Sequence, residues 1–373
     1  MSDDDRQESA AKALKLLQEE AELKGAARQN RYPEQKFFGY FCSYFPEELL
    51  LAADLEPLRL LPDSGNSTPA ELPSYCCSLA RGTLAREISG QWQDLIGVGF
   101  THTCDTMQCL SGIWAAAGHT KTVDLVPPVM LKAQGASRYY LSELESLVVQ
   151  LGVLTHTEIS AAKIRASIGL CNRARELVSQ LDALRPQLPS PLVSALLRAG
   201  QLMPRSEYIK ALEACYPTIQ AMAMPQEQRT GILISGAVLE NDHLLAMIED
   251  LGGRVVADDT CTGYRHYSGP RVSGRDNPLQ DIVQRYTEMP PCPCKHRGLN
   301  ERHNYLEALA QQRKARAAIL VIRKFCEPHA WDSLSLARQL QNSGLRTLIL
   351  ELEGTDVGGQ ERTRLQAFLE NLT

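Results

Sequence analysis

Residues 94–118 read DLIGVGFTHTCDTMQCLSGIWAAAG and contain the unit from which the predicted fold is built. An apolar run of strand length, DLIGVGF (94–100), leads through a short polar turn into MQCLSGIWAAAG (107–118), which has helical composition. A strand followed directly by a helix is typical of parallel βα units. The turn between them carries Cys104, which we therefore expect at the carboxyl end of a strand.

The same pattern recurs on both sides of this unit. Residues 137–225 interrupt it, because they show no strand signal and read as helices broken by Gly and Pro. We therefore predict an α/β fold with two doubly wound, flavodoxin-like parallel sheets of about four strands each, a helical segment between them and an N-terminal helix over 4–29. The predicted strands are 37–41, 57–61, 94–100, 122–126, 231–236, 254–259, 317–322 and 346–352. The predicted segments are 1–35 (N-terminal helical), 36–136 (first α/β domain), 137–225 (connecting helices) and 226–373 (second α/β domain).

Composition narrows the class of protein. The chain has 373 residues, of which 44% are hydrophobic, and this is enough for two or three globular domains. The net charge is −5 and no basic stripe is present, which argues against nucleic acid as the main partner. The N-terminus lacks a basic start and an apolar segment, and no run approaches the ~18 apolar residues of a membrane span. We expect a cytoplasmic protein without a membrane partner.

Eleven cysteines are many for such a chain. Cys171 and Cys215 lie in helical sequence, where small buried apolar residues are expected. Most others lie in turn-like sequence after apolar runs, where parallel sheets bind ligands. Thiols gathered at a cleft in a reducing compartment predict a metal site. No CxxC is present, which favours an iron–sulfur cluster over zinc and leaves a redox thiol pair as a third alternative. The cysteines concerned are Cys42, Cys76, Cys77, Cys104, Cys261, Cys292, Cys294 and Cys326.

Five segments, taken in order, resemble one known family over most of the chain. They are CSYFPEELLLAADLEPLRL (42–60), CSLARG (77–82), THTCDTMQC (101–109), RKFCEP (323–328) and GGQERTRLQAFLE (358–370). The family is that of 2-hydroxyacyl-CoA dehydratases and benzoyl-CoA reductases. Its members hold a [4Fe–4S] cluster on three cysteines and leave one iron without a protein thiolate. Carried over to this sequence, the resemblance implies Cys77, Cys104 and Cys326 as the ligands.

The resemblance also implies an activity and partners. It implies a dehydratase or reductase subunit that takes low-potential electrons from a separate ATP-dependent iron–sulfur activator and delivers them to an acyl-CoA or aryl-CoA substrate. No Walker A loop occurs in this chain, so ATP hydrolysis would belong to the activator. A homologous subunit is implied as well, in a homodimer or a heterodimer.

The additional cysteines depart from the simple pattern of the family. One branch of the family carries a double-cubane [8Fe–9S] cluster, in which each cubane needs three thiolates, and its members resemble reductases of small molecules. Six thiolates would come from Cys76, Cys77, Cys104, Cys261, Cys326 and one of Cys292 or Cys294. A third interpretation is a non-catalytic, cluster-bearing partner subunit.

Other side chains are candidates for supporting roles. Glu48 is a candidate acid or base if burial raises its pKa, although acidic residues at a helix start often only complement the helix dipole. His102 is a candidate hydrogen-bond donor to cluster sulfur or substrate, or else a structural histidine. Arg81 and Arg265 can pair with phosphate or cluster charge, with a surface ion pair as the favoured alternative. Cys42 and Cys109 are expected to pack near the site without binding iron.

Overall fold

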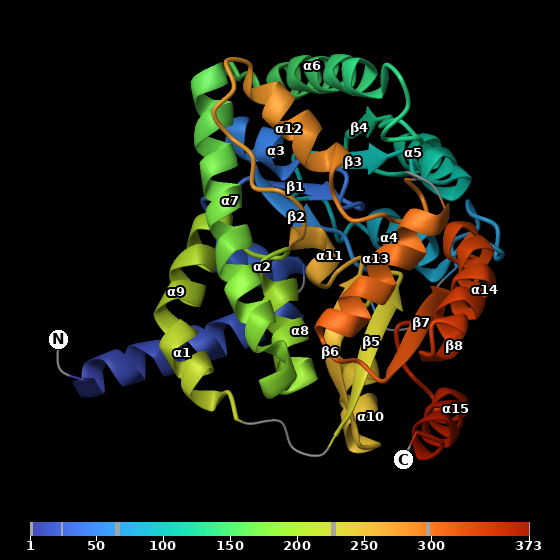
Figure 1. Ribbon diagram of the computed structural model, residues 1–373. Helices are drawn as coiled ribbons and strands as arrows, with labels where there is room; N and C mark the ends of the chain where they lie inside the picture. The colour runs from blue at the N-terminus through green and yellow to red at the C-terminus, as the bar shows by residue number, and fades with distance from the viewer. Residues whose placement is uncertain (1–2, 24, 64–67, 225–228, 296–298, 373) are drawn as a thin grey trace.

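The computed structural model describes residues 3–23, 25–63, 68–224, 229–295 and 299–372 (Figure 1). It contains two four-stranded sheets, and every pair of neighbouring strands is parallel. The predicted α/β class with two doubly wound sheets is confirmed. Within the described ranges, no helix combines the length and the apolarity needed to cross a bilayer.

The first sheet has the strand order β2-β1-β3-β4. Its central strands β1 and β3 are buried along their whole length, as expected for parallel strands covered on both faces. The strands are β1 (Phe37–Tyr40), β2 (Glu56–Arg59), β3 (Val98–Thr101) and β4 (Thr122–Leu125), and the helices between them are α3 (Glu47–Ala52), α4 (Ser78–Ile88) and α5 (Asp105–Ala117).

The second sheet repeats this topology in the order β6-β5-β7-β8. Its strands are β5 (Thr230–Gly236), β6 (Gly253–Thr260), β7 (Ala317–Arg323) and β8 (Arg346–Leu352). Its helices are α10 (His243–Asp250), α11 (Tyr264–Tyr267), α12 (Pro278–Thr287), α13 (Leu299–Gln312), α14 (Glu327–Asn342) and α15 (Gly359–Glu370). In both sheets the chain reverses its direction of winding between the two central strands, and ligands bind in α/β folds beside such a switch point.

Helices connect the two sheets. They are α6 (Ala136–Thr155), α7 (Ala161–Leu184), a 3₁₀ turn (Arg185–Gln187), α8 (Ser190–Ala199) and α9 (Arg205–Met222). The helix predicted over 4–29 is two helices, α1 (Asp3–Glu22) and α2 (Gly25–Arg31), because Gly25 has a φ of +47° that a continuous helix does not allow. Leu17 and Ala21 of α1 pack into the apolar cluster formed with α7, α8 and α9. The predicted boundary at 225/226 lies outside the described residues.

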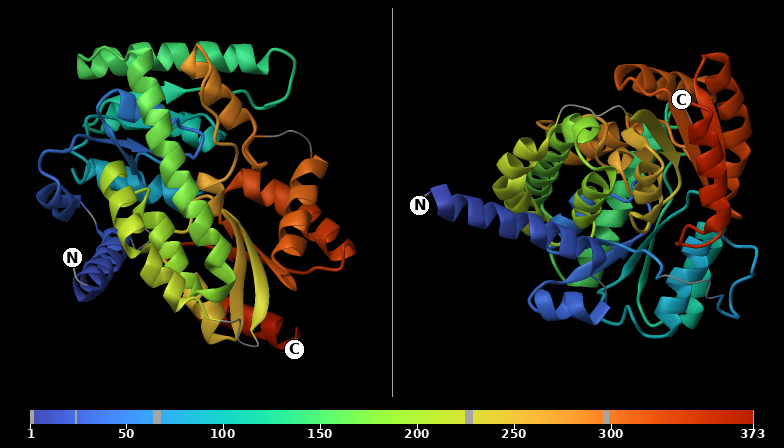
Figure 2. Two further views of the ribbon diagram at one scale, coloured as in Figure 1. Left: turned by 60° about the vertical axis from the view of Figure 1, so that its left-hand side comes forward. Right: turned by 90° about the horizontal axis from the view of Figure 1, so that it is seen from below.

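The long helix α7 runs alongside both halves of the molecule (Figures 1 and 2). Near its middle, the Arg175 guanidinium pairs with Glu48 of the first half at 2.6 Å. At its end, Asp182 accepts a hydrogen bond from Arg185, which lies 3.3 Å from Asp258 on β6. Buried ion pairs therefore attach one helix to both sheets.

Direct contacts also join the two sheets where their carboxyl ends face each other. The Ser43 hydroxyl, just after β1, donates to the carbonyl of Cys261, just after β6, at 3.2 Å. The buried ammonium of Lys295 donates to the carbonyls of Pro127 at 2.8 Å and of His102 at 3.3 Å. These contacts fix the loops of one sheet against those of the other.

Candidate functional site

Three cysteines occupy the same position at the start of three helices. Cys77, Cys104 and Cys326 are the N-cap residues of α4, α5 and α14, each with a non-helical backbone conformation. The N-terminus of a helix carries a partial positive charge and free N–H groups, so it favours an anionic side chain. A thiolate is stabilised at such a position, as is a negatively charged group bound to it.

The fold brings these three helix starts together. Cys77 belongs to the apolar cluster beside the first sheet, which includes Phe100 and Trp114, and Cys104 and Cys326 pack against the same cluster. Cys104 follows a central strand of the first sheet and Cys326 follows a central strand of the second. Cys104 and Cys326 therefore lie at the two switch points, and Cys77, in the loop after the edge strand β2, lies in the apolar cluster against which both pack.

Burial governs the acidity of these thiols. It raises the pKa of all three, that of Cys104 to about 11, and the Cys77 thiol raises the pKa of Cys104 and Cys326 further. Hydrogen bonding from the backbone of Leu79 and Ala80 partly offsets the effect of burial on Cys77. Because each pKa lies above that of an ordinary thiol, the three groups are neutral thiols at pH 7.

Cationic and imidazole side chains surround the three thiols. Arg323, at the end of β7, is buried, and burial lowers its pKa to about 10 while the Cys77 and Cys326 thiols raise it. Nδ1 of His329 lies 3.3 Å from Sγ of Cys326. Burial, together with the charges of Arg265 and Arg302, lowers the pKa of His329 to about 3, so the ring is neutral at pH 7.

The two arginines considered from the sequence are not surface residues. Arg81 is 6% exposed and Arg265 is 3% exposed, so the favoured prediction of surface ion pairs is wrong for both. The Arg81 charge lowers the pKa of Cys76 and Cys77. Nη1 of Arg265 donates to Sγ of Cys261 at 3.4 Å, while the rest of its guanidinium binds Asp259. Both side chains therefore place positive charge at the thiols.

A second group of thiols lies next to the first. We call Cys42, Cys261, Cys292 and Cys294 the second thiol group. Cys292 is part of the core cluster beneath the first sheet, and Cys42 and Cys294 pack against it. Burial raises the pKa of Cys42 to about 12, and the thiols of Cys292 and Cys261 raise it further. The backbone N–H of Cys294 donates to Sγ of Cys292 at 3.3 Å, within a tight turn that ends at the buried Lys295.

Cys76 lies with Cys77 in the apolar cluster against which Cys261 packs, and not in the cluster that contains Cys292. Burial raises the pKa of Cys76, and the nearby side chains that act on it are Cys77, Arg81 and, on α5, Cys109 and Thr106. Cys76 is buried on the α5 side of its loop. Cys42, which we expected to pack near the site, packs beside Cys292 and Cys294, and the thiols of Cys292 and Cys261 act on its pKa.

Glu48 is a buried ion-pair partner in this structure. Its Oε1 lies 2.6 Å from Arg175, and its Oε2 accepts a hydrogen bond from the Tyr286 hydroxyl at 3.0 Å. Burial alone would raise its pKa, but the charges of Arg175 and Arg285 hold the pKa below its usual value. The raised pKa on which a role as acid or base depended is not found.

The His102 side chain faces the edge strand of the first sheet. Its Nε2 lies 3.0 Å from Oδ1 of Asp124 on β4, which also accepts a hydrogen bond from the Ser111 hydroxyl at 2.6 Å. Its backbone carbonyl, rather than its ring, contacts Lys295 from the other half. His102 therefore fixes the loop that carries Cys104.

Sequence reasoning missed three side chains of the site, namely His329, Arg323 and Lys295. His329 follows Cys326 by three residues, a spacing that places both on one face of the first turn of a helix. Arg323 ends a continuous apolar strand and precedes Cys326 by three residues. Lys295 belongs to a basic run of the sequence (294–303), but its contacts could not be predicted, because they are with residues more than 160 positions away.

Cys171 and Cys215 are buried within α7 and α9, as predicted. Within the described part of the chain, no group of three or more His, Cys, Asp or Glu side chains is arranged to hold one metal ion. The thiolates of a cubane each bind a different iron atom, so a cluster places a different geometric demand on its ligands than a single ion does.

Comparison with known proteins gives consistent matches over almost the whole chain. The family model described as "2-hydroxyglutaryl-CoA dehydratase, D-component" matches residues 42–372. Lactoyl-CoA dehydratase subunit beta of Anaerotignum propionicum is 25% identical over 343 residues, covering 90% of this chain and 91% of that protein. The (R)-phenyllactyl-CoA dehydratase beta subunit of Clostridium sporogenes is 21% identical over 351 residues (91% and 92%), and a benzoyl-CoA reductase subunit of Thauera aromatica is 26% identical over 361 residues (88% and 92%).

Proposed function

The chain belongs to the family of 2-hydroxyacyl-CoA dehydratase and benzoyl-CoA reductase components, and on this basis we propose that it is the iron–sulfur subunit of such an enzyme. In this proposal Cys77, Cys104 and Cys326 hold a [4Fe–4S] cluster. The single observation that carries it is the common position of the three thiols, at the N-termini of three helices that meet where the two sheets face each other.

The donor set fits this group. Cys77, which is buried, and Cys104 and Cys326, which are half-buried, would supply one ligand fewer than the irons of a cubane, so that one iron would lack a protein thiolate. Such a cluster supplies a Lewis acid and a one-electron donor in the same place.

The protein's own residues favour charge at the site and keep water away from it. The helix starts orient backbone N–H groups toward the thiolates, and Arg323 and Arg81 offset their negative charge. The ring of His329 supports Sγ of Cys326 from the first turn of α14. Phe41, Phe100 and Trp114 cover the site from the side of the first sheet.

The low-potential electrons would come from an ATP-dependent activator, and a homologous subunit would complete the enzyme. Each of the matched relatives is named as one subunit of an enzyme, which supports a partner subunit. Large apolar side chains beside the ligands also support a covered surface: Tyr75 is 69% exposed, Phe325 41% and Trp331 86%. Tyr75 and Phe325 directly precede Cys76 and Cys326.

The second thiol group favours one alternative, a double-cubane [8Fe–9S] reductase of small molecules. Cys42, Cys261 and the Cys292–Cys294 turn supply three or four thiols beside the first three, of which Cys292 is buried and the others are half-buried. Arg265, Arg59 and Lys295 place positive charge around them, which a second anionic cluster would use. In this alternative the sixth ligand is Cys42 rather than Cys76.

Measuring iron and acid-labile sulfide in anaerobically purified protein tests the proposal. One cubane gives about four iron atoms per chain and a double cubane gives about eight. Absence of iron, with one zinc per chain, would reject both. Activity is then assayed with a 2-hydroxyacyl-CoA or an aryl-CoA, an activator and ATP. A third outcome identifies the non-catalytic partner role. In that case the chain holds a reducible cluster and does not bind the substrate, and turnover requires a homologous subunit.

A further inference from the structure

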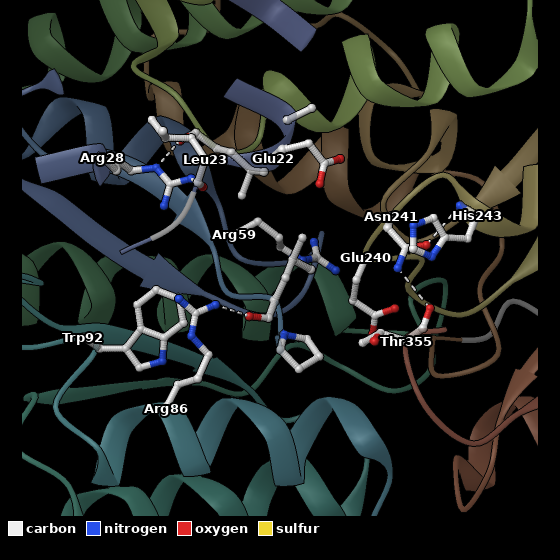
Figure 3. Close-up of a pocket in the computed structure, with 14 residues that line it drawn as sticks. Glu22, Leu23, Arg28, Arg59, Arg86, Trp92, Glu240, Asn241, His243 and Thr355 are labelled. Atoms are coloured by element: carbon white, nitrogen blue, oxygen red, sulfur yellow. Dashed lines mark hydrogen bonds between the residues drawn. The ribbon is translucent and has the colours of Figure 1, made fainter. Parts of the chain in front are cut away.

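A cavity of about 170 Å³ lies where the N-terminal helices meet both halves of the molecule (Figure 3). Arg28 of α2 and Arg86 of α4 lie at one end, and Glu240 and His243 at the other, with Arg59 between them. Segments distant in the sequence therefore converge on one small polar cavity. None of its lining residues is a predicted cluster ligand.

Three guanidinium groups line this cavity, and all three are buried. Arg28 and Arg86 are each 5% exposed, and Arg59 is 2% exposed. Burial lowers the pKa of Arg28 to about 10, and the charge of Arg86 lowers it further. The charge of Glu20 partly offsets these effects on Arg28. Like charges buried out of water remain unfavourable unless further anions compensate them.

The carboxylates near the cavity are engaged with other cations. Glu22 pairs with Arg198 at 2.8 Å, and Glu240 pairs with Arg323. Asp63 lies 3.2 Å from Arg86 and forms an ion pair with it. Among the described residues, no carboxylate lies within ion-pair distance of Arg28 or Arg59.

The partners of the arginines leave donors available. Arg28 donates to the backbone carbonyls of Leu202, at 2.8 Å, and Leu23, neither of which is charged. Arg59 donates from Nη1 to the Ser43 hydroxyl at 3.3 Å, and its buried Nε has no hydrogen-bond partner among the described residues. A buried donor without an acceptor destabilises a protein, so such a group points to a missing acceptor.

The rigid placement of the arginines indicates what the acceptor is. Arg86 stacks on the indole of Trp92 at 3.9 Å and is hydrogen-bonded to the Leu61 carbonyl, so its guanidinium is held in one orientation. Guanidinium groups that converge from several directions match the several oxygens of a phosphoryl group better than a planar carboxylate. The cavity is below the roughly 300–1,000 Å³ of sites that enclose a drug-sized molecule, so it suits a compact anion.

We propose that this cavity is a binding site for a phosphoryl group, either as free orthophosphate or as part of a larger molecule, held by Arg28, Arg59 and Arg86. The site contains none of the cysteines, although the charge of Arg59 also acts on the thiols of Cys42 and Cys261. Free phosphate and a phosphorylated coenzyme share this chemistry, so the experiment separates them.

Calorimetric titration of the full chain with orthophosphate, pyrophosphate and coenzyme A, at ionic strength held constant with chloride, tests the proposal. We expect saturable one-to-one binding of at least one of these, and a rise in the melting temperature with that ligand. Competition between orthophosphate and coenzyme A assigns one shared site. If coenzyme A binds and orthophosphate does not, the cavity binds a phosphoryl group only as part of the larger molecule.

Variants of the arginines decide whether the cavity is responsible. Arg59→Gln and Arg86→Gln should each weaken binding about tenfold or more, which corresponds to the loss of one charged hydrogen bond, while Arg59→Lys retains part of the affinity. Arg173→Gln on the exposed face of α7 is the matched control and should leave binding unchanged. The melting temperature without ligand verifies that each variant is folded. The proposal fails if no ligand binds saturably, or if binding survives both glutamine substitutions.

Discussion

Nδ1 of His329 lies 3.3 Å from Sγ of Cys326, and the two residues occupy the first turn of α14. The ring is neutral at pH 7, because burial and two neighbouring arginines lower its pKa to about 3. A neutral ring can donate one hydrogen bond to sulfur without adding charge. His329 therefore fixes the orientation of one thiol in the way that outer residues support ligands at metal sites.

Replacing His329 should weaken iron binding. We expect His329→Asn to release iron to a chelator with an apparent affinity lower by about 10–100-fold, the usual effect of removing such a support. Iron retained against a series of chelator concentrations is the measurement. His119→Asn, at an exposed histidine, is the control and should behave like the unaltered protein. Equal retention in both variants would contradict a supporting role.

Each of the three helix-start cysteines should be required for the proposed cubane. Cys77→Ser, Cys104→Ser and Cys326→Ser should each abolish or strongly reduce the cluster absorption and the iron content of the anaerobic protein. Cys109→Ser changes an exposed thiol on α5 and should retain the full iron content. An unchanged iron content in any of the three variants removes that residue from the ligand set.

Cys42 and Cys76 should respond differently if a second cubane is present. Because Cys42 lies with the second thiol group and Cys76 faces α5, Cys42→Ser should lower the iron content from about eight to about four per chain, and Cys76→Ser should not. The opposite result would restore Cys76 as the sixth ligand. An unaltered protein with only about four iron atoms would exclude the second cubane.

The Glu48–Arg175 pair should make stability depend on pH. The folded-state pKa of Glu48 is lowered, so its stabilising effect is complete above the ordinary glutamate pKa of about 4.3 and is lost as the pH falls toward the lower folded-state value. Glu48→Gln leaves Arg175 buried without its partner and should lower the free energy of unfolding at pH 7 by about 3–5 kcal/mol. Urea titrations at pH 7 and pH 3.5 provide the measurement.

Glu213→Gln is the matched control for this pair. Glu213 lies 2.6 Å from Arg173, but both side chains are more than 40% exposed, and exposed pairs contribute about 0–1 kcal/mol. The two substitutions therefore differ in burial and not in chemistry. Similar losses in both variants would show that burial does not determine the strength of the Glu48–Arg175 pair.

Gly236, at the carboxyl end of β5, should not tolerate a side chain. Its φ is +151°, and a Cβ atom would clash with the carbonyl oxygen of Val321 on the neighbouring strand. Gly236→Ala should destabilise the protein by about 1–3 kcal/mol and displace the strand that leads to Cys326. Gly112→Ala, in the open interior of α5, should instead stabilise it by about 0.5–1 kcal/mol. Thermal unfolding of the two variants compares them directly.

The strands could be read from the sequence because parallel strands buried on both faces are continuous apolar runs. DLIGVGF (94–100) predicted β3 and AAILVI (317–322) predicted β7, each within a few residues of the observed bounds. The prediction of one helix over 4–29 was less accurate. Gly25 adopts a positive φ, and the helix-forming residues around it gave no sign of this break in the sequence.

Partners across the fold could not be predicted, because they depend on how the two halves dock. Glu48 and Arg175 are 127 positions apart, and nothing in either local sequence indicates the ion pair that lowers the Glu48 pKa. For the same reason, the sequence did not indicate that Cys42 lies close to Cys261 and Cys292. Cysteines that directly follow predicted strands were easier to place, since the ends of parallel strands meet at one edge of a sheet.

The positions of the three helix-start thiols have a consequence during synthesis on the ribosome. Cys104 and Cys326 are about 220 residues apart in the chain, so at about 5–20 residues per second some 10–45 seconds pass between their translation. The first sheet can form in that interval with Cys77 and Cys104 already in place but without the third thiol. A nascent chain thus carries an incomplete set of reactive sulfurs, which oxygen or a wrong metal can reach before the second sheet arrives.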